Sequence, residues 1–89
     1  MRQPSCTRQF ERDVKRLKKR RRDAAKLKVV MGDWIAKKAL AAKHRDHALL
    51  GNYKGRRECR VELDWLLIYK LEPHRIIFER TGAHSDLFE

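Results

Sequence analysis

The hydrophobic pattern of the chain changes its period near the middle, and this change limits the folds that the chain can adopt. Up to residue 35 the apolar residues recur at helical spacing, whereas after Gly55 they alternate or run continuously, as in strands. This order predicts an α+β fold in which an N-terminal helical hairpin packs on one face of a small, mainly antiparallel sheet. Because 89 residues are too few for two ordinary hydrophobic cores, we expect one domain over residues 1–89.

The first half of the chain predicts a helical hairpin from about Thr7 to Lys38. Thr7 and Asp23 are suited to cap two helices, because their side-chain oxygens can accept the unpaired N–H groups of a first turn. Apolar stripes follow both caps at helical spacing. The stripes consist of Phe10, Val14 and Leu17 in the first helix and of Leu27, Val30, Met31, Trp34 and Ile35 in the second.

The second half predicts three strands, over residues 57–63, 65–71 and 75–80. The first alternates apolar and polar residues, and the second is almost continuously apolar, as a central strand would be. The segment 72–74 turns the chain, and Gly82 is expected to end the last strand and to leave a short tail. A further strand is expected near residues 2–6, where Pro4 limits its pairing.

The charge of the chain points to a polyanionic partner. Lys and Arg number 23 against 12 Asp and Glu, so the formal net charge is +11, and the excess lies mainly between Arg8 and Lys28. Nucleic acid is the commonest partner for such an excess, since each neutralised phosphate releases counterions and adds affinity. Arg16 and Lys19 are candidate RNA-binding residues in this region. The alternative is a charged helix face that only meets solvent.

Several classes of protein are not indicated. The apolar runs are far shorter than the roughly 20 residues that span a bilayer, and no signal peptide is apparent, so we expect an intracellular protein. Cys6 and Cys59 lack the paired spacing of a zinc site, and reduced thiols are expected. His44 and His47 could share a helical face, but a metal would need a third ligand and a second shell. We therefore expect no metal and no cofactor.

Residues 80–88, at the end of the expected final strand and in the tail, carry side chains that suit RNA cleavage. Arg80, His84 and Phe88 supply a guanidinium, an imidazole and an aromatic ring. Cleavage needs a base for the 2′-OH, an acid for the leaving 5′-oxygen, a cation for the phosphorane and a surface for an unstacked base. Imidazole, with an unperturbed pKa of roughly 6.5, can exchange a proton near neutral pH. Asp64 and Trp65 lie where two strands join. The alternatives to a functional role are an ordinary turn for Asp64 and a core anchor for Trp65.

The chain resembles the RelE superfamily of bacterial toxins, and its YafQ branch most closely. The resemblance rests on Asp46–Glu58 (DHALLGNYKGRRE), Asp64–Lys70 (DWLLIYK), Phe78–Phe88 (FERTGAHSDLF) and the helix Phe10–Leu17 (FERDVKRL). It implies a compact α+β toxin that enters the ribosomal A site and cuts mRNA there without a metal. It also implies a cognate antitoxin that holds the toxin inactive.

The resemblance further implies a catalytic set of His47, Asp64, Arg80, His84 and Phe88, with Trp65 beside it. In this assignment His84 is the general acid toward the 5′-oxygen, and His47 or Asp64 serves as the base or orients it. Arg80 would stabilise the scissile phosphate, and Phe88 would position a base of the message.

Two further residues are implied to contact RNA. Lys54 could bind a phosphate, and Arg60 stands where close relatives of this branch carry another histidine. Arginine cannot act as a base in a protein, but it can bind phosphate bidentately. The role of the base therefore shifts toward Asp64 and His47.

These observations lead to the expectation of a ribosome-dependent endoribonuclease toxin in the bacterial cytoplasm, with the ribosome and mRNA as partners. The net charge predicts that the antitoxin brings an acidic, partly disordered segment, which would cover Arg80 or His84. A different class remains open: a non-catalytic ribosome or RNA binder, or a ParE-like poison of a topoisomerase, on the same scaffold. A pure binder would have no need of both Arg80 and His84.

Overall fold

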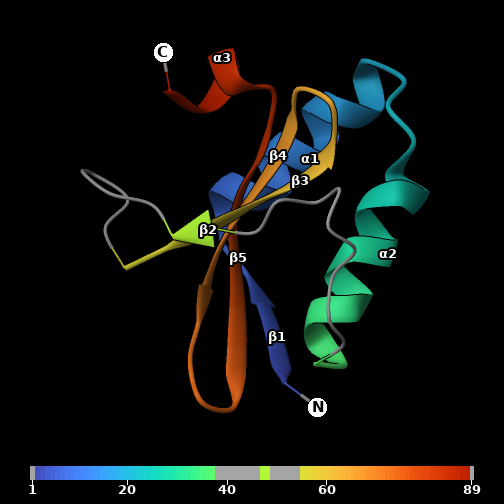
Figure 1. Ribbon diagram of the computed structural model, residues 1–89. Helices are drawn as coiled ribbons and strands as arrows, with labels where there is room; N and C mark the ends of the chain where they lie inside the picture. The colour runs from blue at the N-terminus through green and yellow to red at the C-terminus, as the bar shows by residue number, and fades with distance from the viewer. Residues whose placement is uncertain (1, 38–46, 49–54, 89) are drawn as a thin grey trace.

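The computed structural model describes residues 2–37, 47–48 and 55–88, and it confirms the predicted α+β class (Figure 1). The elements are β1 (Gln3–Cys6), α1 (Arg8–Lys19), α2 (Ala24–Ile35), β2 (His47–Ala48), β3 (Arg57–Glu62), β4 (Trp65–Leu71), β5 (Arg75–Gly82) and α3 (His84–Phe88). The strands form one sheet in the order β1-β5-β4-β3-β2. The strand β1 runs parallel to β5, and the other neighbours are antiparallel.

Both predicted helix caps are present. The hydroxyl of Thr7 accepts the N–H of Phe10 at 3.0 Å, and the carboxylate of Asp23 accepts the N–H of Ala25 at 3.0 Å. Basic side chains crowd the last turn of α1, where the helix dipole favours cations. The hairpin thus begins where it is expected, and its second helix ends at Ile35, slightly before the expected end near Lys38.

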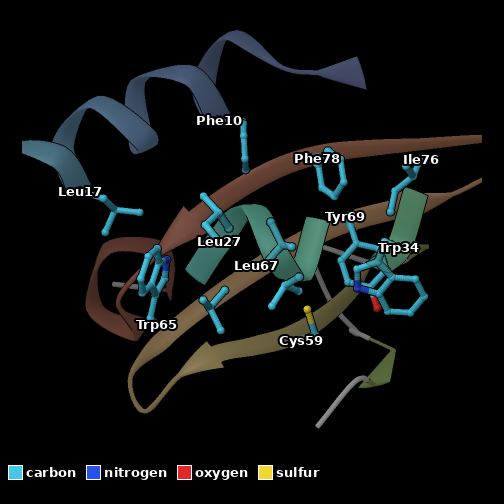
Figure 2. Packing of buried hydrophobic residues seen from close by; sticks show 12 residues of the cluster. Phe10, Leu17, Leu27, Trp34, Cys59, Trp65, Leu67, Tyr69, Ile76 and Phe78 are labelled. Carbon is cyan, nitrogen blue, oxygen red and sulfur yellow. The ribbon is translucent and has the colours of Figure 1, made fainter. Parts of the chain in front are cut away.

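The helices α1 and α2 cover one face of the sheet, α1 against β5 and α2 against β3. Alternate residues of β4 point into this layer, and Trp65, Leu67 and Tyr69 are at most 1% exposed. Figure 2 shows these side chains packed with those of the two helices. The remaining buried members of this core are Phe10, Leu17, Leu27, Val30, Trp34, Cys59, Val61, Ile76 and Phe78.

The other face of β4 carries a second, smaller apolar cluster. Leu66 and Ile68 are buried there with Leu87, which belongs to α3. The expectation of a short tail after Gly82 is therefore wrong: β5 runs to Gly82, and residues 84–88 form a helix. This helix is stabilised by burial of Leu87 on the sheet. No local pattern in the sequence predicts this contact.

The helix α1 begins beside β5, and this start places it next to the C-terminal half of that strand. The strand β1 pairs with β5 as far as Phe78. Thr7 then donates its N–H to the carbonyl of Phe78 at 3.1 Å and its hydroxyl to the carbonyl of Glu79 at 2.9 Å. Farther along β5, α1 contacts the strand through Asp13, whose carboxylate accepts the N–H of Thr81.

The fold bears on three further expectations, which concern the cysteines, helices that could span a membrane, and the pair His44 and His47. Both cysteines are free thiols, Cys59 within the core and Cys6 exposed. Of the helices in the described ranges, none has the length and apolar character needed to cross a membrane. The idea that His44 and His47 share a helical face is wrong at His47, whose backbone is extended in β2; His44 lies outside the described residues.

Candidate catalytic site

Strand pairing brings several of the candidate residues into two neighbouring rows of the sheet. The register gives one row of His47, Glu58, Ile68 and Arg80 and a neighbouring row of Arg60, Leu66 and Gly82. The row also places the backbone of His47 three strand spacings, about 14 Å, from that of Arg80. The His47 side chain lies outside the description.

Asp64 and His84 are brought together although twenty residues separate them. Asp64 turns the chain between β3 and β4 with a φ of 55°, a left-handed conformation in which Asp is several-fold enriched. Its carboxylate accepts the backbone N–H of His84 at 3.1 Å. Both residues are exposed, so the carboxylate and the imidazole stand at one solvent-facing corner of the molecule.

The helix α3 presents an aromatic ring beside this imidazole. His84 and Phe88 are four residues apart on one helix face, and their ring centroids lie 5.0 Å from each other. Phe88 is 38% exposed. An exposed ring next to an imidazole is a surface on which an unstacked nucleobase can lie.

Arg80 is held by a buried carboxylate of α1. Its Nε and one Nη donate to Asp13 at 2.8 and 3.2 Å, and the same carboxylate accepts the N–H of Thr81 at 3.1 Å. Asp13 is 0% exposed, and the Arg80 side chain is 20% exposed. Two donors on one carboxylate fix the plane of the guanidinium, which is what electrostatic stabilisation of a phosphate requires.

Trp65 is a buried residue of the hydrophobic core. It is 1% exposed, and its indole N–H donates to the hydroxyl of Thr81 at 2.9 Å. The guanidinium of Arg22 lies over its ring at 5.4 Å from the centroid. The core-anchor alternative holds, and the expected RNA contact by Trp65 is wrong because no ring face is available to a base.

The other expected RNA-binding residues fall in different places. Arg60 is half-buried and lines a shallow hollow of about 370 Å³ at the end of β3. Lys19 is exposed on α1, whereas Arg16 forms ion pairs within the protein, with Asp13 and Asp86. Lys54 lies outside the described residues.

Asp86 is a residue that the sequence analysis did not single out. Arg20 donates to its two carboxylate oxygens at 2.8 and 3.2 Å, and Ala83 donates its N–H at 3.0 Å. The hydrogen bond from Arg20 lowers the pKa of Asp86 below its ordinary value, so this carboxylate is ionised at neutral pH. Together with Asp64, it satisfies the N–H groups at the start of α3.

The comparisons with known proteins agree with the fold. A family model described as the bacterial toxin of type II toxin-antitoxin system, YafQ, matches residues 2–89. The chain is 47% identical over 81 residues to the mRNA interferase toxin YafQ of Escherichia coli (strain K12), a match that covers 90% of this chain and 88% of that protein.

Solved structures of YafQ are also similar to this chain. The crystal structure of YafQ from E. coli strain BL21(DE3) superposes with a TM-score of 0.95 at 42% identity, and the match covers 100% of both chains. A chain in the crystal structure of the E. coli DinJ-YafQ toxin-antitoxin complex has a TM-score of 0.91 at 44% identity, over 99% of this chain and 98% of that one. On these grounds the chain belongs to the YafQ family of bacterial toxins of type II toxin-antitoxin systems.

Proposed function

We propose that this chain is an mRNA interferase that cuts messages in the ribosomal A site by general acid–base catalysis, without a metal. The E. coli relative is named an mRNA interferase toxin, which supports the substrate class. The observation that carries the mechanism is the hydrogen bond from the His84 backbone N–H to Asp64, because it holds the residue that bears the imidazole next to this carboxylate at an exposed position.

The proposed reaction is an in-line attack of a 2′-OH on the adjacent phosphorus. The base, Asp64 or His47, takes the 2′-OH proton while the bond from the 2′-oxygen to phosphorus forms. The bond to the 5′-oxygen breaks, and His84 protonates that oxygen. The products are a 5′-OH fragment and a fragment that ends in a cyclic or 3′-phosphate.

Two further groups have supporting roles in this proposal. Arg80, oriented by Asp13, stabilises the charge that develops on the phosphorane. Phe88 stacks on a base of the message and so fixes the phosphate relative to His84. Lys19, Lys54 and Arg60 add phosphate contacts.

The Asp64→Asn variant separates the role of Asp64 as a base from its role as a helix cap. The amide oxygen of asparagine can still accept the His84 N–H, and asparagine tolerates the left-handed turn, so α3 should keep its place. Loss of the carboxylate should slow cleavage by about 10²-fold or more if it takes the proton. The measurement is the cleavage rate at saturating toxin. An unchanged rate would leave Asp64 as a cap and shift the base to His47.

The experiment that tests the function uses purified protein and ribosomes programmed with a defined message. We expect translation arrest together with discrete mRNA fragments that carry a 5′-OH. The same message without ribosomes is the matched control for ribosome dependence. Arrest without fragments would contradict cleavage and favour a binder that acts by occupancy. Fragments with a 5′-phosphate in place of the 5′-OH would contradict the proposed attack by the 2′-OH.

We also propose that an acidic antitoxin holds this chain inactive. The relative in the DinJ-YafQ complex is bound to its antitoxin, and the +11 charge of this chain gives an acidic segment a complementary surface. Such a segment would block the site by covering Arg80 or His84, and salt would weaken the association.

A further inference from the structure

One face of α1, continued by its C-cap residue Arg20, carries three charges that connect two parts of the candidate site. Asp13, Arg16 and Arg20 are spaced i, i+3 and i+7, so they follow one side of the helix. Asp13 binds Arg80 of β5, and Arg20 binds Asp86 of α3. Arg16 lies between them, 3.5 Å from each of the two carboxylates. The result is an unbroken chain of ion pairs from Arg80 to α3.

The two ends of this chain hold different catalytic groups. At one end, Asp13 orients the guanidinium of Arg80. At the other end, Asp86 lies between His84 and Phe88 in the sequence of α3, so holding its carboxylate holds the helix that carries both rings. The helix α3 has only five residues and buries Leu87 alone, and it therefore needs contacts beyond its own hydrogen bonds to stay in place.

Asp86 is held by contacts with several neighbouring residues. Its side chain is 12% exposed and that of Arg20 is 50% exposed, so the pair is partly open to solvent. Two parallel hydrogen bonds and the network with Arg16 are the features that let such a pair contribute. The carboxylate of Asp86 also lies against Gly82, where a Cβ would meet the Asp86 Oδ2 at 3.0 Å. The absence of a side chain at residue 82 lets Asp86 turn back to the Ala83 N–H and still reach Arg20.

We propose that the Asp13–Arg16–Arg20 face of α1 is a strut that sets the position of His84 and Phe88 relative to Arg80, with Asp86 as the positioning residue on α3. These charges act on catalysis through other residues and not through contact with RNA. The inference rests on the proposed cleavage activity, and it gives part of the basic helix a role other than phosphate binding.

The first test compares Arg20→Ala with Lys19→Ala, which removes the same charge from the same turn. The strut predicts that Arg20→Ala lowers the rate constant at saturating toxin by about 10-fold, since a misplaced group slows the chemical step. Lys19→Ala should instead raise the concentration of toxin that gives half the maximal rate. Arg20→Lys, which keeps the charge and a donor, should recover part of the loss. If Arg20→Ala behaves like Lys19→Ala, the strut is wrong and Arg20 is an RNA contact.

A double-mutant cycle with Asp86→Asn tests whether Arg20 acts through Asp86. The asparagine can still accept the Ala83 N–H, so this variant removes the ion pairs and leaves the cap. Each single variant should slow the saturated rate by about 10-fold, and the double variant should be no slower than either one. Independent effects, with the double variant about 100-fold slower, would overturn the coupling.

A third measurement does not depend on activity, and it separates failure of the strut from failure of the proposed function. Backbone amide order parameters of residues 84–88 should be near 0.85 in the wild type and should fall below about 0.6 in Arg20→Ala and Asp86→Asn. They should stay high in Lys19→Ala. If α3 stays equally ordered in all variants, the strut is refuted even where cleavage is observed. If the wild type forms no fragments but these order parameters change as expected, the proposed cleavage fails and the strut stands as a structural element.

Discussion

Replacement of His84 by alanine is expected to slow cleavage of ribosome-bound mRNA by about 10²- to 10⁴-fold, the usual contribution of a positioned general acid. The side chain is exposed and its backbone N–H, not its ring, binds Asp64, so the variant should fold and should keep α3 in place. The measurement is the cleavage rate constant at saturating toxin. Binding to the ribosome should change little, because the loss falls on the chemical step.

The matched control for this prediction is His74→Ala. His74 is also exposed, but it lies in the turn before β5, at the opposite end of the strand that leads to His84. This variant should cleave at the wild-type rate. A loss of similar size in both variants, or a His84→Ala protein that cleaves normally, would remove His84 from the mechanism.

Replacement of Asp13 by alanine is expected to have the largest effect on stability. The substitution leaves the Arg80 guanidinium and the Thr81 N–H without their buried acceptor. Breaking a buried pair by removal of one partner costs about 3–5 kcal/mol. That loss is a large share of the roughly 5–15 kcal/mol by which domains are stable. Urea unfolding should show a lower midpoint, and Asp13→Asn, which keeps one acceptor oxygen, should lose less.

The exposed acid Glu11, in the first turn of the same helix, provides the comparison. Glu11→Ala removes an equal charge from α1 and should change the free energy of unfolding by no more than about 0.5 kcal/mol, as surface substitutions usually do. If Asp13→Ala were as stable as Glu11→Ala, the carboxylate of Asp13 would not be what holds Arg80 and the edge of β5.

The elements with a clear hydrophobic period could be predicted closely. The caps at Thr7 and Asp23 and the apolar stripes behind them gave the two helices, because both signals are local. The strand β4 was expected over the residues it occupies, since a continuous apolar run suits a strand covered on both faces. The strand β1 forms despite Pro4, as it lies at the edge of the sheet and pairs on one side, with β5.

The helix α3 could not be predicted in the same way. Five residues cannot form a stable helix alone, and this one depends on Leu66, Ile68 and Asp64, which are distant in the sequence. The buried position of Asp13 could have been predicted from the helical pattern of the sequence. Asp13 occupies the i+3 position of the stripe that begins at Phe10, and a charge on a buried helix face requires a partner.

The candidate site shows the same division between local and distant information. Arg80, His84 and Phe88 could be grouped because they are close in the sequence. The joining of Asp64 to His84, and of Arg80 to α1, follows from strand pairing and helix docking, which composition and spacing do not reveal. Trp65 illustrates the converse: its place beside Asp64 in the sequence indicated the site, but its side chain belongs to the core.

The role of His84 as the acid can be measured most directly with a message that carries sulfur in place of the bridging 5′-oxygen at the cleaved bond. A thiolate leaves without protonation, so this message no longer needs a general acid. We expect His84→Ala to cut it at close to the wild-type rate while it remains about 10²-fold or more slower on the ordinary message. An equal defect on both messages would contradict protonation of the leaving group by His84.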